Sequence, residues 1–286
     1  MRHTLSTLRK TLAGGRKLAM LTCYDASFAR LMDAAGVDTL LVGDSLGMVV
    51  QGHDSTLPVT VDDIAYHTAC IARGAPRAFL VADMPFGSYH EDAAQAMRNA
   101  VTLMKAGAQM VKLEGGAEIA PIVKQYVLAG IPVCAHVGLL PQHVNAVGGF
   151  RVQGRDAASA ERILADAQAL DAAGAAMVLI EGVPEDVGRR VAESVGAITI
   201  GIGASGACDG QVLVMHDMLG MTDRPARFVK DFTRELAPGE GNLIERAFRA
   251  YAEEVGAGRF PAAEHVYAAT GDAAAAYGGA NAPKAG

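Results

Sequence analysis

The sequence predicts a single (β/α)8 barrel, the TIM barrel, with a short N-terminal helix and a C-terminal helical appendage. Three observations support this fold class. Eight short apolar runs recur along the 286 residues, helical patterns separate most of them, and a glycine closes many of the helical stretches. A glycine just after a helix ends it, and the short links that follow are typical of alternating units in a parallel sheet.

The elements can be placed by their residue ranges. The expected strands are 18–25, 39–45, 78–83, 110–114, 132–137, 176–181, 197–203 and 211–215. The expected helices between them are 26–35, 61–73, 92–106, 118–129, 158–173 and 185–195. The helix after the seventh strand is expected to be missing or minimal, because the glycine-rich residues 203–210 lead almost directly into the eighth.

The chain is expected to form one catalytic domain over residues 1–266. Its ends carry a surface helix within residues 1–16 and a final helix at 242–255. Residues 267–286 are rich in alanine and glycine and lack periodicity, so we expect a disordered tail.

Composition excludes several classes of protein. The chain is 51% hydrophobic and 20% charged, as expected for a large buried core, and its net charge of −6 argues against a nucleic-acid partner. No apolar run is long enough to span a bilayer, and the basic N-terminus lacks the apolar segment of a secretory signal. We therefore expect a cytoplasmic protein without a membrane partner.

The four cysteines are widely spaced. A zinc site or a disulfide framework needs closer spacing, so reduced thiols in a reducing compartment are the preferred interpretation. These residues are Cys23, Cys70, Cys134 and Cys208.

Polar side chains lie at the ends of six consecutive predicted strands. The carboxyl ends of the strands build the active site of a barrel enzyme, so these positions predict such a site. One polar residue at the start of a loop would be ordinary, but six strands in succession are not. The residues are Tyr24, Asp25, Asp44, Ser45, Asp83, Lys112, Glu114, His136 and Glu181.

Three of these side chains suggest a metal. Asp44, Asp83 and Glu114 are hard oxygen ligands without a nearby cysteine or histidine pair, which favours Mg²⁺ or Mn²⁺ over Zn²⁺. Lys112 lies two residues before Glu114, so both side chains share the barrel interior. Lys112 can balance the carboxylates or anchor a substrate carboxylate. A purely structural ion pair with Glu114 or Asp83 is the alternative.

Two further strand ends suggest proton chemistry or packing. Glu181 closes an apolar run opposite the metal strands, and a carboxylate in such surroundings is suited to act as a general base. His136 can line the same site or be a hydrogen-bonded core histidine. The weaker candidates lie in or near loops and are His53, His90, His143 and His216.

A glycine motif at residues 201–206 matches G-x-G-x-x-G. Dinucleotide binding requires a helix opening at the third glycine and an acidic residue about twenty positions later. Here residues 208–210 lead into another strand. The motif therefore favours a tight loop at the barrel mouth.

Several sequence blocks resemble the ketopantoate hydroxymethyltransferase family, and the resemblance extends from about residue 5 to 266. The blocks are MLTCYD at 20–25, VGDSLG at 42–47, DMPFGSY at 83–89, VKLEGG at 111–116, AHVGLLPQ at 135–142 and CDGQ at 208–211.

The resemblance implies a barrel enzyme of pantothenate and coenzyme A biosynthesis. Its members transfer a hydroxymethyl group from the co-substrate 5,10-methylenetetrahydrofolate to 3-methyl-2-oxobutanoate through a magnesium-stabilised enolate, giving 2-dehydropantoate. It also implies a homo-oligomer, specifically a decamer.

The resemblance further implies individual roles. One Mg²⁺ per subunit would be held by Asp44 and Asp83, with Glu114 binding it directly or through water, and Glu181 would be the catalytic base. Ser45 and Lys112 would hold the substrate carboxylate. The substrate-binding set is Tyr24, Asp44, Ser45, Asp83, Lys112 and His136.

Two other interpretations remain. Another Mg²⁺-dependent barrel enzyme acting beside a 2-oxo acid, such as an isocitrate-lyase-like or phosphonomutase-like protein, would share the acidic strand ends. It would be expected to carry a cysteine loop, but residues 87–92 contain no cysteine. A non-catalytic scaffold or sensor would not need Asp44, Asp83 and Glu114 together.

Overall fold

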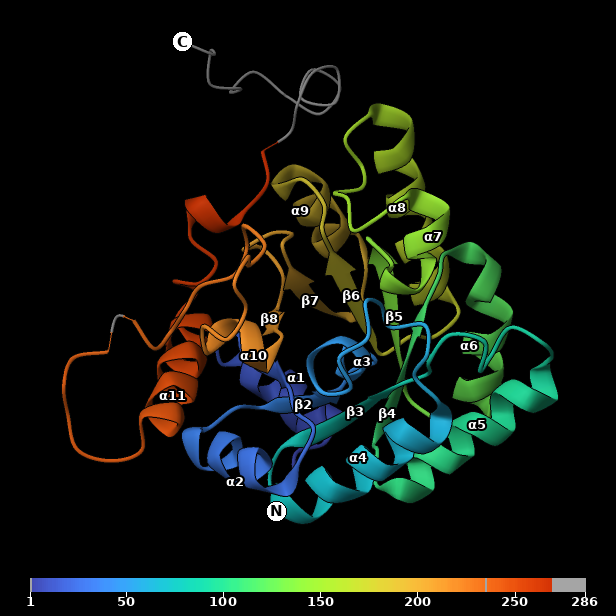
Figure 1. Cartoon of the computed structure of the whole chain (residues 1–286). Helices are drawn as coiled ribbons and strands as arrows, with labels where there is room; N and C mark the ends of the chain where they lie inside the picture. Colours follow the sequence, from blue (N-terminus) through green and yellow to red (C-terminus); the bar gives the residue numbers. More distant parts are fainter. Residues whose placement is uncertain (1, 235, 269–286) are drawn as a thin grey trace, which may run out of the picture.

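In the computed structural model, which describes residues 2–234 and 236–268, eight parallel strands close into a barrel in chain order (Figure 1). The predicted fold class is confirmed, and every strand overlaps its predicted range. The strands are β1 Leu18–Thr22, β2 Thr39–Val42, β3 Phe79–Asp83, β4 Met110–Glu114, β5 Val133–Gly138, β6 Met177–Glu181, β7 Ile198–Ile202 and β8 Gly210–Leu213.

The long helices surround the strands, as Figure 1 shows. They are α2 Ala26–Ala35, α4 Val61–Gly74, α5 Ala93–Ala106, α6 Ala120–Leu128, α8 Ala157–Ala172, α9 Glu185–Ser194 and α11 Leu243–Gly256. The helix expected at 118–129 is divided into the 3-10 turn η1 Ala117–Ile119 and α6. The chain passes from β7 to β8 without a helix, as predicted.

Several short elements were not predicted. They are α3 Leu46–Val49, η2 Pro141–His143, α7 Val144–Val147, α10 Met215–Met218 and η3 Ala263–His265. A single turn is too short to show a helical period. Met215, expected at the end of the eighth strand, begins α10 instead, and its N–H donates to Thr22 Oγ1 at 2.9 Å.

The strands alternate between two buried faces. One face packs under the helices, and the other fills the barrel with an inner apolar cluster that includes Met110, Cys134 and Leu179. Two residues further along the same inward faces stand Lys112, His136 and Glu181. Because inward side chains recur every two residues, these polar side chains lie next to the inner apolar cluster, at the carboxyl ends of the strands.

The N-terminal helix α1 Leu5–Ala13 closes the amino end of the barrel. Thr4 caps it by accepting a hydrogen bond from Thr7 N at 3.3 Å. Leu8 is 0% exposed and belongs to the inner apolar cluster, as does Leu18 at the start of β1. The expected surface helix is thus also a plug that contributes to the core.

The C-terminal segment returns to the barrel at α9. Tyr267 forms a parallel bridge with Pro184, and its carbonyl accepts from Glu185 N at 2.8 Å. Residues 269–286, most of the tail expected to be disordered, lie outside the described residues.

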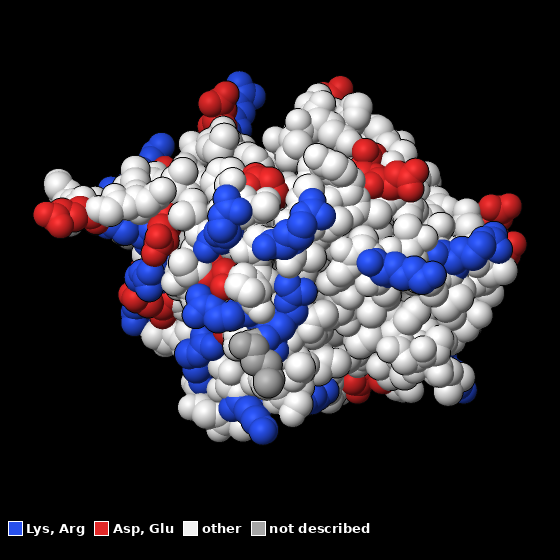
Figure 2. Space-filling view, turned by 90° about the horizontal axis from the view of Figure 1, so that it is seen from below, with Lys and Arg blue, Asp and Glu red and all other residues white. Residues whose placement is uncertain are grey.

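Surface charge is unevenly distributed. The face in Figure 2 carries many Lys and Arg side chains, with Asp and Glu mostly nearer its edges, although the whole chain is at −6. The prediction that nucleic acid is not a partner rests on the whole-chain charge and stays a prediction. Within the described residues, no helix combines the length and apolar character needed to cross a membrane.

Helix α1 should stabilise the fold, because it packs Leu8 into the inner apolar cluster. Leu8→Ala should lower the free energy of unfolding by about 2–5 kcal/mol, because it leaves a cavity in the inner cluster. Leu128→Ala on α6 is the matched control, since Leu128 is 80% exposed and should change stability by less than about 0.5 kcal/mol. Urea denaturation measures both changes. Equal midpoints for the two variants would show that α1 does not seal the barrel.

Candidate active site

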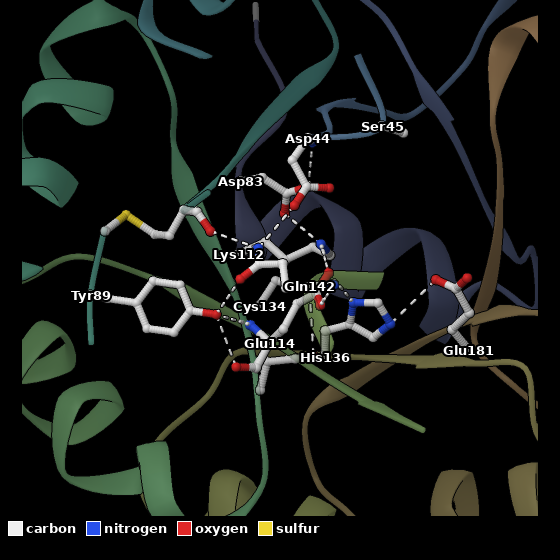
Figure 3. A network of polar contacts seen from close by, with 12 residues as sticks. Asp44, Ser45, Asp83, Tyr89, Lys112, Glu114, Cys134, His136, Gln142 and Glu181 are labelled. Atoms are coloured by element: carbon white, nitrogen blue, oxygen red, sulfur yellow. Dashed lines mark hydrogen bonds and ion pairs between the residues drawn. The ribbon is translucent and has the colours of Figure 1, made fainter. Parts of the chain in front are cut away.

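Lys112 stands at the centre of a buried ionic cluster at the carboxyl ends of the strands (Figure 3). Its Nζ lies 2.5 Å from Asp83 Oδ1 and 3.6 Å from Glu114 Oε1. The lysine side chain is 5% exposed and the two carboxylates are 2% and 1% exposed. Burial lowers the pKa of Lys112, but the surrounding carboxylates raise it well above its ordinary value, so the lysine is charged.

Asp44 approaches this cluster from the end of β2. Its N–H donates to Asp83 Oδ2 at 2.9 Å, and its Oδ2 accepts from Gln142 Nε2 at 2.9 Å. Burial raises the pKa of Asp44 well above its ordinary value, and the charges of Asp83 and Glu114 raise it further. The described side chains thus disfavour the charged form of Asp44, which a bound cation would stabilise.

His136 joins the cluster to Glu181. Its Nδ1 lies 3.4 Å from Glu114 Oε1 and its Nε2 lies 3.3 Å from Glu181 Oε2, without hydrogen-bond alignment. Burial and Lys112 lower the pKa of His136, but the carboxylates outweigh them and raise it to about 9. Burial raises the pKa of Glu114, yet His136 and Lys112 bring it down to about 2. At neutral pH the histidine is therefore a cation between two carboxylates.

The hydroxyl groups of Tyr24 and Ser45 belong to residues that follow β1 and β2. They share a hydrogen bond of 2.9 Å, and burial raises the pKa of Tyr24, so the phenol stays neutral. Asp25 does not join the site. Its Oδ1 accepts from Ser27 N and Phe28 N, and it caps α2.

Two residues of the cluster were missed from the sequence. Gln142 donates from Nε2 to Asp44, and its N–H donates to Glu114 Oε2 at 3.0 Å. The Tyr89 hydroxyl lies 2.8 Å from Gln142 Oε1 and accepts from Glu114 N at 3.2 Å. Gln142 lies in η2 and Tyr89 in the loop after β3, so both lie beyond the strand ends. Their places in the DMPFGSY and AHVGLLPQ blocks were the available signal.

The donor set fits a magnesium ion at two of the three predicted ligands. Among the described residues, no group of three or more His, Cys, Asp or Glu side chains is arranged to hold a metal. Glu114 is instead engaged by His136, Lys112 and Gln142. Asp44 and Asp83 are adjacent buried carboxylates, and no described residue donates to Asp44 Oδ1. One or two carboxylates completed by water and substrate oxygens are a usual Mg²⁺ site.

The weaker histidine candidates lie around the site. His216 stacks on Tyr24 with ring centroids 5.7 Å apart, and His90 lies against Tyr89 at 4.1 Å. His143 lines a neighbouring cavity, and His53 is exposed. The glycine motif at 201–206 begins in β7 and continues into the first part of the link to β8, and all four cysteines are free thiols.

Solved structures with a similar fold share little sequence with this chain. Phosphoenolpyruvate phosphomutase from Streptomyces platensis subsp. rosaceus has a TM-score of 0.58 at 16% identity, covering 77% of this chain and 83% of that one. A 2,3-dimethylmalate lyase of the PEP mutase/isocitrate lyase superfamily has a TM-score of 0.53 at 18% identity, covering 70% and 72%. These likenesses show the fold alone, which the lyase-like interpretation also expects.

Sequence comparisons decide the family. The protein named 3-methyl-2-oxobutanoate hydroxymethyltransferase in Dechloromonas aromatica (strain RCB) is 55% identical, covering 94% of this chain and 97% of that protein. The protein of the same name in Neisseria gonorrhoeae (strain NCCP11945) is 56% identical, covering 93% and 99%. The family model for ketopantoate hydroxymethyltransferase matches residues 2–263. This chain belongs to the ketopantoate hydroxymethyltransferase family.

Proposed function

We propose that this protein transfers a hydroxymethyl group from 5,10-methylenetetrahydrofolate to 3-methyl-2-oxobutanoate, giving 2-dehydropantoate for pantothenate synthesis. The observation that carries the proposal is the buried cluster in which Lys112 contacts Asp83 and Glu114, and His136 connects Glu114 with Glu181. The names of the relatives give the acceptor and the transferred group.

Anchoring of the 2-oxo acid requires donors for its carboxylate. Lys112 supplies a buried ammonium group held at the mouth by Asp83. Ser45 supplies a hydroxyl whose orientation is fixed by Tyr24. A charge-assisted hydrogen bond in this water-poor site is stronger than one between neutral groups. The two donors approach from β4 and β2 and would orient the substrate across the barrel mouth.

Asp44 and Asp83 would hold one Mg²⁺ per subunit, with Glu114 contributing through water. When bound, the ion supplies Lewis-acid polarisation of the 2-oxo group, which makes the C3 proton easier to remove. Three carboxyl groups, those of Asp44, Asp83 and Glu114, surround Lys112, and burial raises the pKa of Asp44. A divalent cation would stabilise Asp44 in its charged form and reduce its repulsion of an anionic substrate.

Glu181 would remove the C3 proton of the substrate. Its carboxylate is 16% exposed, so it lies at the open side of the cluster where substrate can reach it. Protonated His136 contacts Glu181 Oε2 and would leave the other oxygen to accept the proton. The electron pair left at C3 would form the bond to the methylene carbon of the donor, whose two bonds to folate nitrogens break in turn. Water would provide the hydroxyl group, and the two folate nitrogens would take one proton from Glu181 and one from that water, which releases tetrahydrofolate.

The family resemblance also supports proposals about location and assembly. Four free thiols suit a reducing compartment, and we place the enzyme in the cytoplasm. We further propose a homodecamer. Light scattering coupled to size exclusion should give ten times the mass of one chain, and the mass of a monomer at micromolar concentration would contradict the assembly.

The role of Glu181 can be tested without a folate. In the presence of Mg²⁺, the parent protein should exchange the C3 hydrogen of 3-methyl-2-oxobutanoate with D₂O, measured by proton NMR. Glu181→Gln should slow the exchange by at least about 100-fold, because the amide cannot accept the proton. Glu91→Gln, at an exposed loop residue, is the matched control. Undiminished exchange in Glu181→Gln would remove this residue as the base.

The role of Asp44 can be tested by metal binding. Asp44→Ala should weaken Mg²⁺ affinity by more than roughly tenfold and abolish metal-dependent binding of the 2-oxo acid, as measured by isothermal titration calorimetry. Asp223→Ala removes an exposed carboxylate as the control. Unchanged Mg²⁺ affinity in Asp44→Ala would exclude Asp44 from direct contact with the ion.

A further inference from the structure

A cavity of about 270 Å³ lies beside the ionic cluster, between the ends of β4 and β5 and helix α8. Its wall includes Gly115, which directly follows Glu114, and Val137, which directly follows His136. The strand ends that carry the cluster thus continue directly into the lining of the cavity.

Strand β6, which ends at Glu181, is joined to the lining of the same cavity by backbone hydrogen bonds. Leu139 N donates to Glu181 O at 2.8 Å, and Gln153 N donates to Gly182 O at 2.8 Å. Leu139 and Gln153 both line the cavity. The backbone of Glu181, the proposed base, is therefore bonded to the wall of this cavity. Asp44 and Ser45 follow β2, on another part of the barrel.

We infer that this cavity binds the reduced pteridine ring of the one-carbon donor. The inference rests on the proposed function, which needs a second substrate near Glu181 when the 2-oxo acid occupies the Asp44 and Lys112 side. The cavity is smaller than a pocket that encloses a whole drug-sized ligand, so it suits the ring while the benzoylglutamate tail remains outside.

The lining has the chemistry of a site for a planar, polar ring. Apolar side chains, including Leu140 and Ile163, supply walls for the ring faces. Asp166 on α8 accepts from Ala117 N at 2.9 Å through Oδ1, which fixes the carboxylate at the cavity. No described residue donates to its Oδ2, which is left for the ring N–H and amino groups of the pteridine.

Arg162 supplies the matching cation. It lies one helical turn before Asp166, so both side chains share one face of α8. Arg162 is exposed, lines the cavity and has no ion-pair partner among the described residues. A guanidinium group binds carboxylates in a bidentate manner, and the glutamate tail of a folate carries such groups. Asp166 would therefore bind the ring within the cavity, and the exposed Arg162 would bind the tail that remains outside it.

Two substitutions test this assignment by separating donor binding from chemistry at the 2-oxo acid. Arg162→Ala and Asp166→Asn should each raise KM for 5,10-methylenetetrahydrofolate about tenfold or more and weaken tetrahydrofolate binding in calorimetry to the same extent. Asp166→Asn keeps the oxygen that accepts from Ala117 N. KM for 3-methyl-2-oxobutanoate should stay at the parent value. Arg98→Ala, at an exposed arginine of α5, is the matched control.

The folate-free C3 exchange distinguishes the possible failures. Parental affinity for tetrahydrofolate in both variants would overturn the cavity assignment. A loss of C3 exchange together with donor affinity would also overturn it, because the substitutions would then have disturbed the ionic cluster. If the parent protein failed to exchange C3, the proposed function would fail, whereas tetrahydrofolate binding would still report on the cavity.

Discussion

The constraint on which the rest of this structure depends is the burial of Lys112 among carboxylates inside a barrel. An uncompensated charge at such depth would cost several kcal/mol, so the lysine requires partners at fixed positions. The pairing of β3 with β4 places Asp83 opposite Lys112, and the pairing of β4 with β5 places Glu114 opposite His136. The register of each strand pair is fixed, because a shift by one residue would turn the inward apolar side chains away from the barrel interior.

The proposed function gives the cluster a role in binding as well as in stability. Lys112 and protonated His136 hold Glu114 as a carboxylate, whereas burial and the charges of Asp83 and Glu114 raise the pKa of Asp44 and disfavour its charged form. Gln142 contacts Asp44 and Glu114 with neutral donors, which fixes their positions without adding positive charge. A structural ion pair with Lys112 would not need Asp44 as a further carboxylate, whereas a divalent cation with a 2-oxo acid would use it.

The fold could be predicted because its signals are local: apolar strand runs, helical periods and the glycines between them. The strand-end rule also found the charged residues of the cluster, since inward alternation continues from the apolar layer into Lys112 and His136. The strand-end rule wrongly included Asp25, because the residue after a strand can instead cap the helix that follows, as Asp25 caps α2. Gln142 could not be found in this way, because it lies in η2 rather than at a strand end and contacts Asp44, a residue 98 positions away in the sequence. The buried face of α1 was missed because a single inward leucine gives no pattern.

We propose that the carboxyl groups around Lys112 bind a 2-oxo acid only together with a divalent cation. Calorimetric titration of the parent protein with 3-methyl-2-oxobutanoate, in Mg²⁺ and in EDTA, distinguishes this from metal-independent binding. We expect one binding site per subunit in Mg²⁺ and no measurable binding in EDTA. Equal affinity under the two conditions would exclude the metal-dependent site and would leave Lys112 and Ser45 as a metal-independent carboxylate site.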